Sequence, residues 1–234
     1  MLRLATICAR SGSKGVPKKN LLNFNGKSLL EITVEHAKMS RMFDYIAIST
    51  DDPKLLEDSK TLKLDVIIKR EKSFSGDLVS KPETVKNLTE KVEEVIGVKI
   101  NTIVDLDITA PLRNKGDIES AINLLESNKL HSVLSGGPSR RNPFFNIVIK
   151  NDKNFIKIVN ENQGFITSRQ AAPQCYDLNG SINVWNRDNL FDKPSTFQEK
   201  TMLFEMKIDQ IFDIDTSFDV QLMEFLMKRK IEIE

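Results

Sequence analysis

The chain has 234 residues, with 34 lysines and arginines against 33 aspartates and glutamates, and 40% of its residues are hydrophobic. This composition excludes a disordered tail protein, and the length suffices for a hydrophobic core without disulfide or metal support. A net charge of +1 excludes a global field for nucleic acid or an anionic membrane, while a local anion site stays compatible with it.

The two cysteines and the first residues bear on the compartment. Neither Cys8 nor Cys175 has the spacing of a metal site or a disulfide framework, which favours a reducing environment. The apolar run at the start is too short for a signal peptide or a membrane span. We therefore expect a cytoplasmic protein that binds neither nucleic acid nor membrane.

The first 135 residues alternate between apolar runs and amphipathic stretches. Hydrophobic periodicity predicts strands at 2–9, 45–49, 65–68, 102–106 and 132–135. Between them it predicts helices at 28–40, 53–60, 84–96 and 115–127. Strict alternation of strand and helix is typical of an α/β fold whose mostly parallel sheet is covered on both faces.

The pattern changes after residue 135. Apolar stretches at 144–149 and 154–159 flank a polar tetrapeptide, which predicts a hairpin. Strands are then expected at 181–185 and 201–206, and a helix at 218–229.

We interpret residues 136–170 as an arm inserted into one domain, which consists of residues 1–135 and 171–234. The hairpin carries more apolar side chains than a two-stranded element can bury. The arm is therefore expected to pack either against its own domain or against a second copy of the chain.

A turn rich in glycine and lysine follows the first predicted strand. Residues 9–20 contain four basic residues, two glycines and two serines. Ligands of α/β sheets bind outside the carboxyl ends of the strands, where glycines let backbone N–H groups converge on an anion. The turn matches neither the Walker A pattern nor the dinucleotide-binding glycine pattern. It favours an anion site, and a solvated basic loop is the alternative.

A pair of aspartates, Asp213 and Asp215, lies near the end of the chain. In an extended segment this spacing puts both side chains on one face, roughly 7 Å apart. Two carboxylates so placed can share a hard cation such as Mg²⁺, although the same pair also suits an ordinary turn. His36, in a predicted helix, and His131, beside a loop, offer no competing metal site.

The turn resembles the A-R-x-x-S-K-G-x-x-x-K-N signature of the CMP-sialic acid synthetases, the acylneuraminate cytidylyltransferases. The matching positions are Ala9, Arg10, Ser13, Lys14, Gly15, Lys19 and Asn20. Further segments resemble family motifs in the same order along the chain: 48–52, Arg70 with Asp77 and Ser80, 109–113, Arg169-Gln170 with Pro173, 179–182 and 213–216. The resemblance spans roughly residues 3 to 225.

The resemblance implies a Rossmann-like three-layer nucleotidyltransferase domain with a small dimerisation arm. The implied reaction moves CMP from CTP to the anomeric 2-hydroxyl of a nine-carbon acidic sugar, a nonulosonic acid, and releases pyrophosphate. The implied cofactor is Mg²⁺, held by Asp213 and Asp215. The implied assembly is a homodimer in which the arm reaches the active site of the partner.

The resemblance also assigns residues to each part of the site. The catalytic residues would be Lys14, Lys19, Asp213 and Asp215. The nucleotide-binding residues would be Arg10, Gly12, Ser13, Lys14, Asn20, Arg70, Asp77 and Ser80, of which the last three lie beside the base or ribose unless they form only a polar loop. The sugar-binding residues would be Asp107, Arg169 and Asn179, and Arg169 is opposite in charge to the carboxylate of the sugar.

The acceptor segment departs from the sialic acid pattern at two points. Asp107 stands where that pattern has glutamine, and an aromatic within residues 141–146 stands where it has lysine. An ionised Asp107 would repel the carboxylate of the sugar and accept from an N–H or a hydroxyl. Both departures resemble the branch that acts on legionaminic acid, which carries a second acylamino group. Asp107 as a cap of the strand end and N-acetylneuraminate as the acceptor stay open.

Three other interpretations of the sequence are possible, and each is less favoured. The synthetase for the eight-carbon acid Kdo lacks the S-K-G-x-x-x-K-N arrangement. A nucleotide-binding module that has lost catalysis would have little reason to keep Lys14 together with Asp213 and Asp215. A scaffold protein is disfavoured because its charged loops would have no anion to bind.

Overall fold

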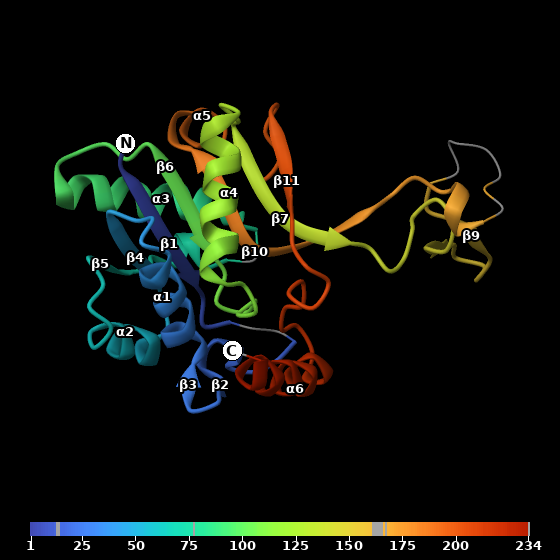
Figure 1. The fold of residues 1–234 in the computed structure, drawn as a ribbon, viewed down its shortest axis with the longest axis horizontal. Helices are drawn as coiled ribbons and strands as arrows, with labels where there is room; N and C mark the ends of the chain where they lie inside the picture. Colours follow the sequence, from blue (N-terminus) through green and yellow to red (C-terminus); the bar gives the residue numbers. More distant parts are fainter. Residues whose placement is uncertain (13–14, 77, 161–165, 167, 234) are drawn as a thin grey trace.

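The computed structural model describes residues 1–12, 15–76, 78–160, 166 and 168–233, and a seven-stranded sheet forms its centre (Figure 1). The strand order is β11-β7-β10-β6-β1-β4-β5. The strands are Arg3–Ala9 (β1), Tyr45–Thr50 (β4), Val66–Lys69 (β5), Thr102–Leu106 (β6), Ser132–Pro138 (β7), Tyr176–Asn186 (β10) and Thr201–Glu205 (β11). Only β10 runs antiparallel to its neighbours in this sheet, so the predicted mostly parallel sheet is confirmed.

Helices cover both faces of this sheet. They are Leu29–Ser40 (α1), Pro53–Ser59 (α2), Lys81–Ile96 (α3), Lys115–Ser127 (α4), Arg187–Asp192 (α5) and Ser217–Ile233 (α6). Buried residues of α1, α2 and α4 join one hydrophobic cluster, which α6 also contacts, and those of α3 and α5 join a second cluster. The strands lie between these clusters, which gives the three layers that the sequence predicts.

The helix starts follow local capping chemistry. Ser28 and Asn114 begin α1 and α4 with capping boxes completed by Glu31 and Asp117. The helix predicted at 84–96 begins three residues earlier, because Ser80 and Glu83 form a capping box and Pro82 fits the first turn. The predicted start at residue 84 is therefore wrong, and Lys81 belongs to the first turn of this helix.

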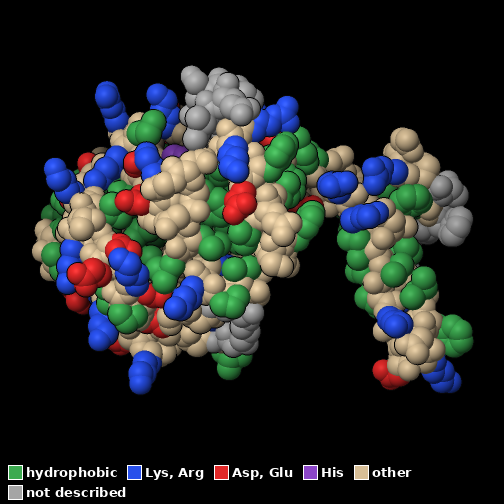
Figure 2. Space-filling model, turned by 90° about the horizontal axis from the view of Figure 1, so that it is seen from below, with side chains coloured by type: hydrophobic (Ala, Val, Ile, Leu, Met, Phe, Trp, Pro, Cys, Tyr) green, Lys and Arg blue, Asp and Glu red, His purple; other side chains and the backbone are tan. Residues whose placement is uncertain are grey.

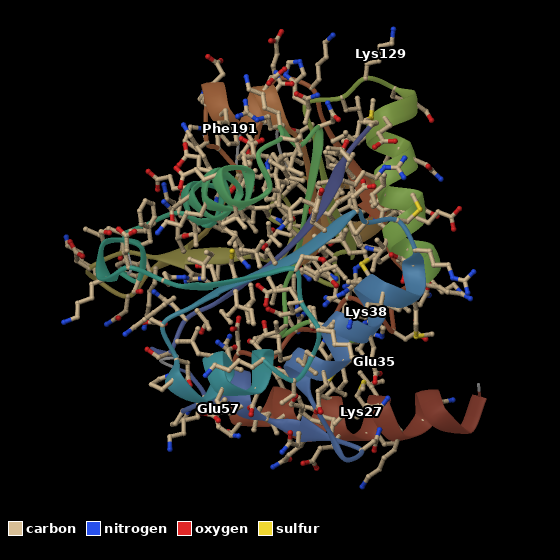
Figure 3. All side chains as sticks on the ribbon, turned by 90° about the vertical axis from the view of Figure 1, so that its left-hand side faces the viewer. Lys27, Glu35, Lys38, Glu57, Lys129 and Phe191 are labelled. Carbon is tan, nitrogen blue, oxygen red and sulfur yellow. The ribbon has the colours of Figure 1, made fainter. Side chains whose placement is uncertain are left out.

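A small hairpin that the sequence did not predict precedes α1. It pairs Asn23–Phe24 (β2) with Lys27–Ser28 (β3), and its turn has Asn25 and Gly26 at positive φ. Lys27 Nζ lies 2.7 Å from Glu35 Oε2 on α1, and Figure 3 shows these two side chains beside the hairpin. The pair joins the hairpin to the helix.

Two strands are longer than the predicted ones. β7 continues beyond Ser135 to Pro138, and β10 begins at Tyr176 instead of Ser181. Glycines in 136–137 suggest a turn, but here they permit close strand pairing, since a Cβ on Gly136 would lie 2.4 Å from the backbone oxygen of Asp177.

The described residues between β7 and β10 (139–160, 166 and 168–175) project away from the body (Figure 1). The arm predicted at 136–170 therefore starts later, because residues 136–138 extend β7, and the name arm is kept for this segment. Its antiparallel hairpin pairs Val148–Lys150 (β8) with Ile156–Ile158 (β9), so the predicted hairpin is confirmed. Figure 2 shows hydrophobic side chains and several Lys and Arg side chains on its visible face. Phe155 and Ile156 are 70% and 67% exposed.

The parallel strands β1, β4, β5 and β6 bring four loops to one edge of the sheet. The edge at their carboxyl ends is the carboxyl edge, and the edge where they begin is the amino edge. Ligand sites of α/β sheets form at carboxyl edges. No helix among the described residues is long and apolar enough to cross a membrane.

Candidate active site

Four charged residues stand directly after four neighbouring strands at the carboxyl edge. Arg10 follows β1, Asp51 follows β4, Arg70 follows β5 and Asp107 follows β6. Three of them are predicted site residues, and the sheet order brings all four loops together.

The glycine-lysine turn is fastened to the edge by its own side chains. Ser11 donates from its backbone N and its Oγ to the two oxygens of Asp51, at 2.8 and 3.0 Å. Burial would raise the pKa of Asp51, but the hydrogen bonds from Ser11 outweigh it and hold that pKa below its ordinary value. Asn20 is buried and donates from Nδ2 to the backbone oxygen of Arg10 at 2.8 Å. The described parts of the turn, residues 9–12 and 15–20, are thus held by side-chain hydrogen bonds, which argues against a solvated basic loop.

The turn also contacts the acidic segment near the end of the chain. Lys19 Nζ donates to the backbone oxygen of Ile214 and to Asp215 Oδ1, both at 2.8 Å. Gly15 lies against the same segment, since a Cβ there would be 2.0 Å from the backbone oxygen of Asp215. Two predicted catalytic residues, 196 positions apart, are therefore in direct contact.

The acidic segment is held by the loop after β6. Ile214 is fully buried and donates from its backbone N to the oxygen of Thr109 at 3.0 Å. Gln210 Nε2 donates to Asp117 Oδ2 on α4 at 2.8 Å. With Ile214 anchored in the core, Asp215 remains 70% exposed at the edge.

Asp213 lies in a field of like charges. Burial raises its pKa to about 6, the charges of Asp215 and Asp107 add to that rise, and Lys19 opposes it. Carboxylate oxygens under mutual repulsion are a donor set that fits a divalent hard cation. Within the described part of the chain, no group of three or more histidines, cysteines, aspartates or glutamates is placed to hold a metal ion. The fit rests on two carboxylates, with waters and phosphates left to complete the shell.

A cavity of about 250 Å³ opens between these loops. Its lining includes four of the predicted site residues: Arg10, Asn20, Arg70 and Asp107. The other lining residues come from β1, from the loop after β5 and from α3: Cys8, Phe74, Gly76, Val79, Lys81 and Thr84.

Arg70 forms a rigid wall of the cavity. It is buried and donates from Nη2 to the backbone oxygen of Ser49 at 2.8 Å and from Nε to Ser49 Oγ at 3.3 Å. These bonds fix its guanidinium beneath the cavity.

Lys81 is a cavity residue that the sequence did not reveal. Its Nζ lies 3.0 Å from Asp105 Oδ2 and 2.7 Å from Asp107 Oδ2. Burial would lower the pKa of Lys81, but the two carboxylates hold it above its ordinary value. Burial would raise the pKa of Asp107, but Lys81 and Thr109 hold it well below its usual range. Recognising the capping box at residues 80–83 would have moved Lys81 to a helix start beside the site.

Asp107 also fastens its own loop. Its Oδ1 accepts from the backbone N and the Oγ1 of Thr109, both at 2.9 Å. One of its two oxygens thus caps the strand end, as one interpretation of the sequence expects, and the other contacts Lys81. The fully buried Arg113 donates to the backbone oxygens of Asp107 and Ala110 at 2.7 and 2.8 Å. The loop that presents Asp107 is therefore rigid.

Three predicted ligand contacts have other roles in the structure. Ser80 caps α3 and its hydroxyl is bonded to Glu83. Asn179 is buried away from the cavity lining, where its Oδ1 accepts from Ser135 Oγ at 2.7 Å. Arg169 lies on the arm in a short 3-10 helix, Arg169–Ala171, and donates to the backbone oxygen of Arg140. Neither Asn179 nor Arg169 lines the cavity beside Asp107.

The remaining predicted nucleotide contacts fall in or beside two gaps. Gly12 is exposed, and no atom of the described residues lies within 4 Å of a Cβ placed on it, its chain neighbours aside. Ser13, Lys14 and Asp77 lie outside the described residues.

Comparison with known proteins identifies the family. The family model described as cytidylyltransferase matches residues 4–232. The chain belongs to the cytidylyltransferase family. It is therefore a nucleotidyltransferase enzyme, as its motifs predict, and the match covers both the basic turn and the acidic segment.

Two curated relatives cover nearly the full chain. A CMP-N,N'-diacetyllegionaminic acid synthase of Campylobacter jejuni is 37% identical over 228 residues, which is 97% of this chain and 95% of that protein. A post-translational flagellin modification protein B of Campylobacter coli is 36% identical over 227 residues, with the same two coverages.

Among solved structures, a CMP:2-keto-3-deoxy-manno-octonic acid synthetase complexed with CTP has a TM-score of 0.71. It is 17% identical and covers 98% of this chain and 100% of its own. At that identity the likeness shows the fold alone, and it confirms the predicted nucleotidyltransferase fold.

Proposed function

We propose that this enzyme transfers CMP from CTP to the anomeric 2-hydroxyl of a nonulosonic acid of the legionaminic type and releases pyrophosphate. The observation that carries the proposal is the contact of the basic turn with the acidic segment, through Lys19 and Asp215, beside a cavity that Asp107 lines. Full-length similarity to a legionaminic acid synthase favours that acceptor.

The reaction needs positive charge around the triphosphate. The 2-hydroxyl oxygen attacks the α-phosphorus and gives up its proton to water, and the bond from this phosphorus to the bridging oxygen breaks as pyrophosphate leaves. Nucleotidyl transfers of this kind gain mainly from positioning and charge stabilisation. Arg10 and Lys19 supply that charge from the turn, and Lys14 is expected to add to it.

Asp213 and Asp215 would hold Mg²⁺ through their carboxylate oxygens. When bound, Mg²⁺ would polarise the α-phosphate and neutralise the departing pyrophosphate. Lys19 keeps Asp215 in place, because its ammonium also binds the backbone oxygen of Ile214.

The walls of the cavity suit a nucleoside on one side and the sugar on the other. Arg70, fixed by Ser49, and Asn20 face the nucleotide in this proposal, and Asp107 faces the acceptor. An acylamino N–H of the sugar can donate to the carboxylate of Asp107.

The arm supports a homodimer as the working form. A two-stranded hairpin with Phe155 and Ile156 largely exposed needs a covering surface, and a second copy supplies one. Arg169, on this arm, would then reach the sugar carboxylate in the partner's site. Replacing Ile156 by glutamate should shift the enzyme to monomer in sedimentation at micromolar concentration, and an unchanged dimer would contradict the role of the arm.

The test of the acceptor is a comparison of turnover. Purified enzyme is mixed with CTP, Mg²⁺ and, in separate reactions, N,N'-diacetyllegionaminate, N-acetylneuraminate or Kdo, and the product is identified by mass. We expect a CMP-sugar with the highest kcat/KM for the legionaminate. A preference for N-acetylneuraminate would overturn the acceptor, and no product with any acid would favour a nucleotide-binding module.

The compartment is part of the same proposal. Both cysteines are free thiols in the structure, and CTP as a substrate fits a cytoplasmic enzyme. Fractionation of cells that express the protein tests this, and recovery outside the cytoplasm would contradict it.

A further inference from the structure

Lys81 joins the start of α3 to the end of β6. It is the first residue of the helix, and its Nζ contacts Asp105 Oδ2 and Asp107 Oδ2 at 3.0 and 2.7 Å. A cation at this place faces the positive end of the helix dipole, so the helix itself disfavours it. The two carboxylates are what stabilise the ammonium there.

The two carboxylates face different surroundings. The Asp105 side chain is fully buried, and its Oδ1 accepts from Thr6 Oγ1 at 2.9 Å. The Asp107 side chain is 25% exposed and lines the cavity, while its Oδ1 accepts twice from Thr109. The ammonium of Lys81 thus compensates two carboxylates: the buried, structural one of Asp105 and the one of Asp107, which lines the cavity.

Compensation matters because the proposed acceptor is itself an anion. An isolated Asp107 would repel a sugar carboxylate at short range. The ion pair with Lys81 reduces that repulsion and still leaves a lone pair on Asp107 Oδ2 for a ligand N–H. Asp107 can therefore accept a hydrogen bond from the sugar without repelling the carboxylate of the same sugar.

We propose that Lys81 is the positioning residue that makes Asp107 usable for an acidic sugar bearing an acylamino group. It holds the carboxylate in place and compensates its charge, so that selectivity for the amide is obtained without rejection of the acid. This inference rests on the proposed function, because it requires an acidic acceptor in the cavity.

The test must separate the two carboxylates. Lys81→Met alone would leave buried Asp105 without a counter-ion and endanger the fold. The double variant Lys81→Met/Asp105→Asn removes that charge together with the lysine, so Asp107 alone is uncompensated. For this variant we expect the KM of N,N'-diacetyllegionaminate to rise about tenfold, the effect of one unit charge near a charged ligand.

Two readouts distinguish charge compensation from loss of structure. The KM of CTP should change by less than about twofold, because its base is neutral and its phosphates lie at the basic turn. Added salt should reverse part of the rise in the sugar KM, since screening weakens repulsion. A merely structural defect would raise both KM values and would not respond to salt.

Three further variants complete the design. Adding Asp107→Asn to the double variant removes the uncompensated charge and should bring the sugar KM back to within about threefold of wild type. Lys81→Arg keeps the charge and should keep the KM low. Lys54→Met is the matched control: it removes an exposed lysine that forms an ion pair with Asp58 on α2, and it should change neither KM.

The inference is overturned if the double variant keeps the wild-type sugar KM, if both KM values rise together, or if Asp107→Asn does not reverse the rise. If the double variant does not fold, Lys81→Arg decides: a sugar KM within about threefold of wild type supports compensation, and a rise above about tenfold contradicts it. Failure of the proposed function looks different, because the wild-type enzyme would then form no CMP-sugar at all.

Discussion

The two edges of the central sheet use the same charged residue types in opposite ways. At the amino edge, Arg3 donates from Nε and Nη2 to the two oxygens of Glu126 at 2.9 and 2.7 Å. Arg187 binds Glu93 in the same bidentate manner at 2.9 and 2.8 Å, and its guanidinium stacks 3.7 Å from the centroid of Phe191. Figure 3 shows Phe191 at the end of the body opposite α6.

At the carboxyl edge the charges are not matched in this way. Asp213, Asp215 and Asp107 share one field, with Lys19 and Lys81 at its two sides. Matched pairs at low exposure stabilise the fold, whereas the partly buried Asp213, with two like charges near it, costs stability and is available for chemistry. The amino edge and the carboxyl edge therefore differ in how their charges are paired, and this difference separates a structural role from a functional one.

The largest expected effect comes from Gly15 at the carboxyl edge. Gly15→Ala places a Cβ 2.0 Å from the backbone oxygen of Asp215, so the turn and the acidic segment must separate. A displacement of this size should reduce turnover by about 10²-fold or more. Steady-state kinetics with CTP and the sugar measure it.

Gly97→Ala is the matched control at the amino edge. Gly97 ends α3 at φ 73°, so alanine should cost about 1 kcal/mol of stability but spare turnover. Equal loss of turnover in both variants would contradict the division between the edges.

Asp213→Asn should reduce turnover about 10²-fold without lowering stability. Because its pKa is raised to about 6 by burial and neighbouring carboxylates, the ionised side chain destabilises the fold at neutral pH. The amide removes that cost, so the melting temperature should stay the same or rise. Retained turnover, or a clear fall in melting temperature, would be inconsistent with the assignment.

Glu93→Gln tests the amino edge itself. It breaks the bidentate contact with Arg187, whose side chain is 15% exposed, and should lower the free energy of unfolding by about 1–3 kcal/mol. Turnover per folded molecule should be unchanged. Urea unfolding and kinetics on the same preparation check both. A loss of turnover without a loss of stability would contradict the structural role of the amino edge.

The smallest effect is a pH dependence at the same edge. The hydrogen bond from Arg3 lowers the pKa of Glu126 below its ordinary value, with burial opposing. A depressed folded-state pKa stabilises the fold above the unfolded pKa of about 4.3 and loses that stabilisation as pH falls through the folded value. The stability gap between wild type and Glu126→Gln should therefore shrink on acidification, and a gap that widens would contradict the sign.

Most of the sheet and its helices could be predicted from the sequence because their signals are local. Apolar runs and capping residues define β6 and α4 at the bounds the structure has. The errors lie where tertiary packing decides, as in the continuation of β7, where Gly136 permits close approach of Asp177.

The site could be predicted only as far as its motifs report it. The motif resemblance assigns both Lys19 and Asp215 to the site, but the hydrogen bond that joins them is a finding of the structure. Lys81 could not be predicted as a site residue, because its role depends on contacts with Asp105 and Asp107. The fold brings these two residues to it from another part of the chain. A motif also does not report that Asn179, a predicted sugar-binding residue, accepts a hydrogen bond from Ser135, because strand pairing brings these two side chains together.

The most direct test of the account is pyrophosphate release by three proteins under one condition. Wild type, Asp215→Asn and Glu126→Gln are each mixed with CTP, Mg²⁺ and N,N'-diacetyllegionaminate. We expect release by wild type and by Glu126→Gln, and a loss of about 10²-fold or more in Asp215→Asn. Undiminished release by Asp215→Asn, or none by wild type, would contradict it.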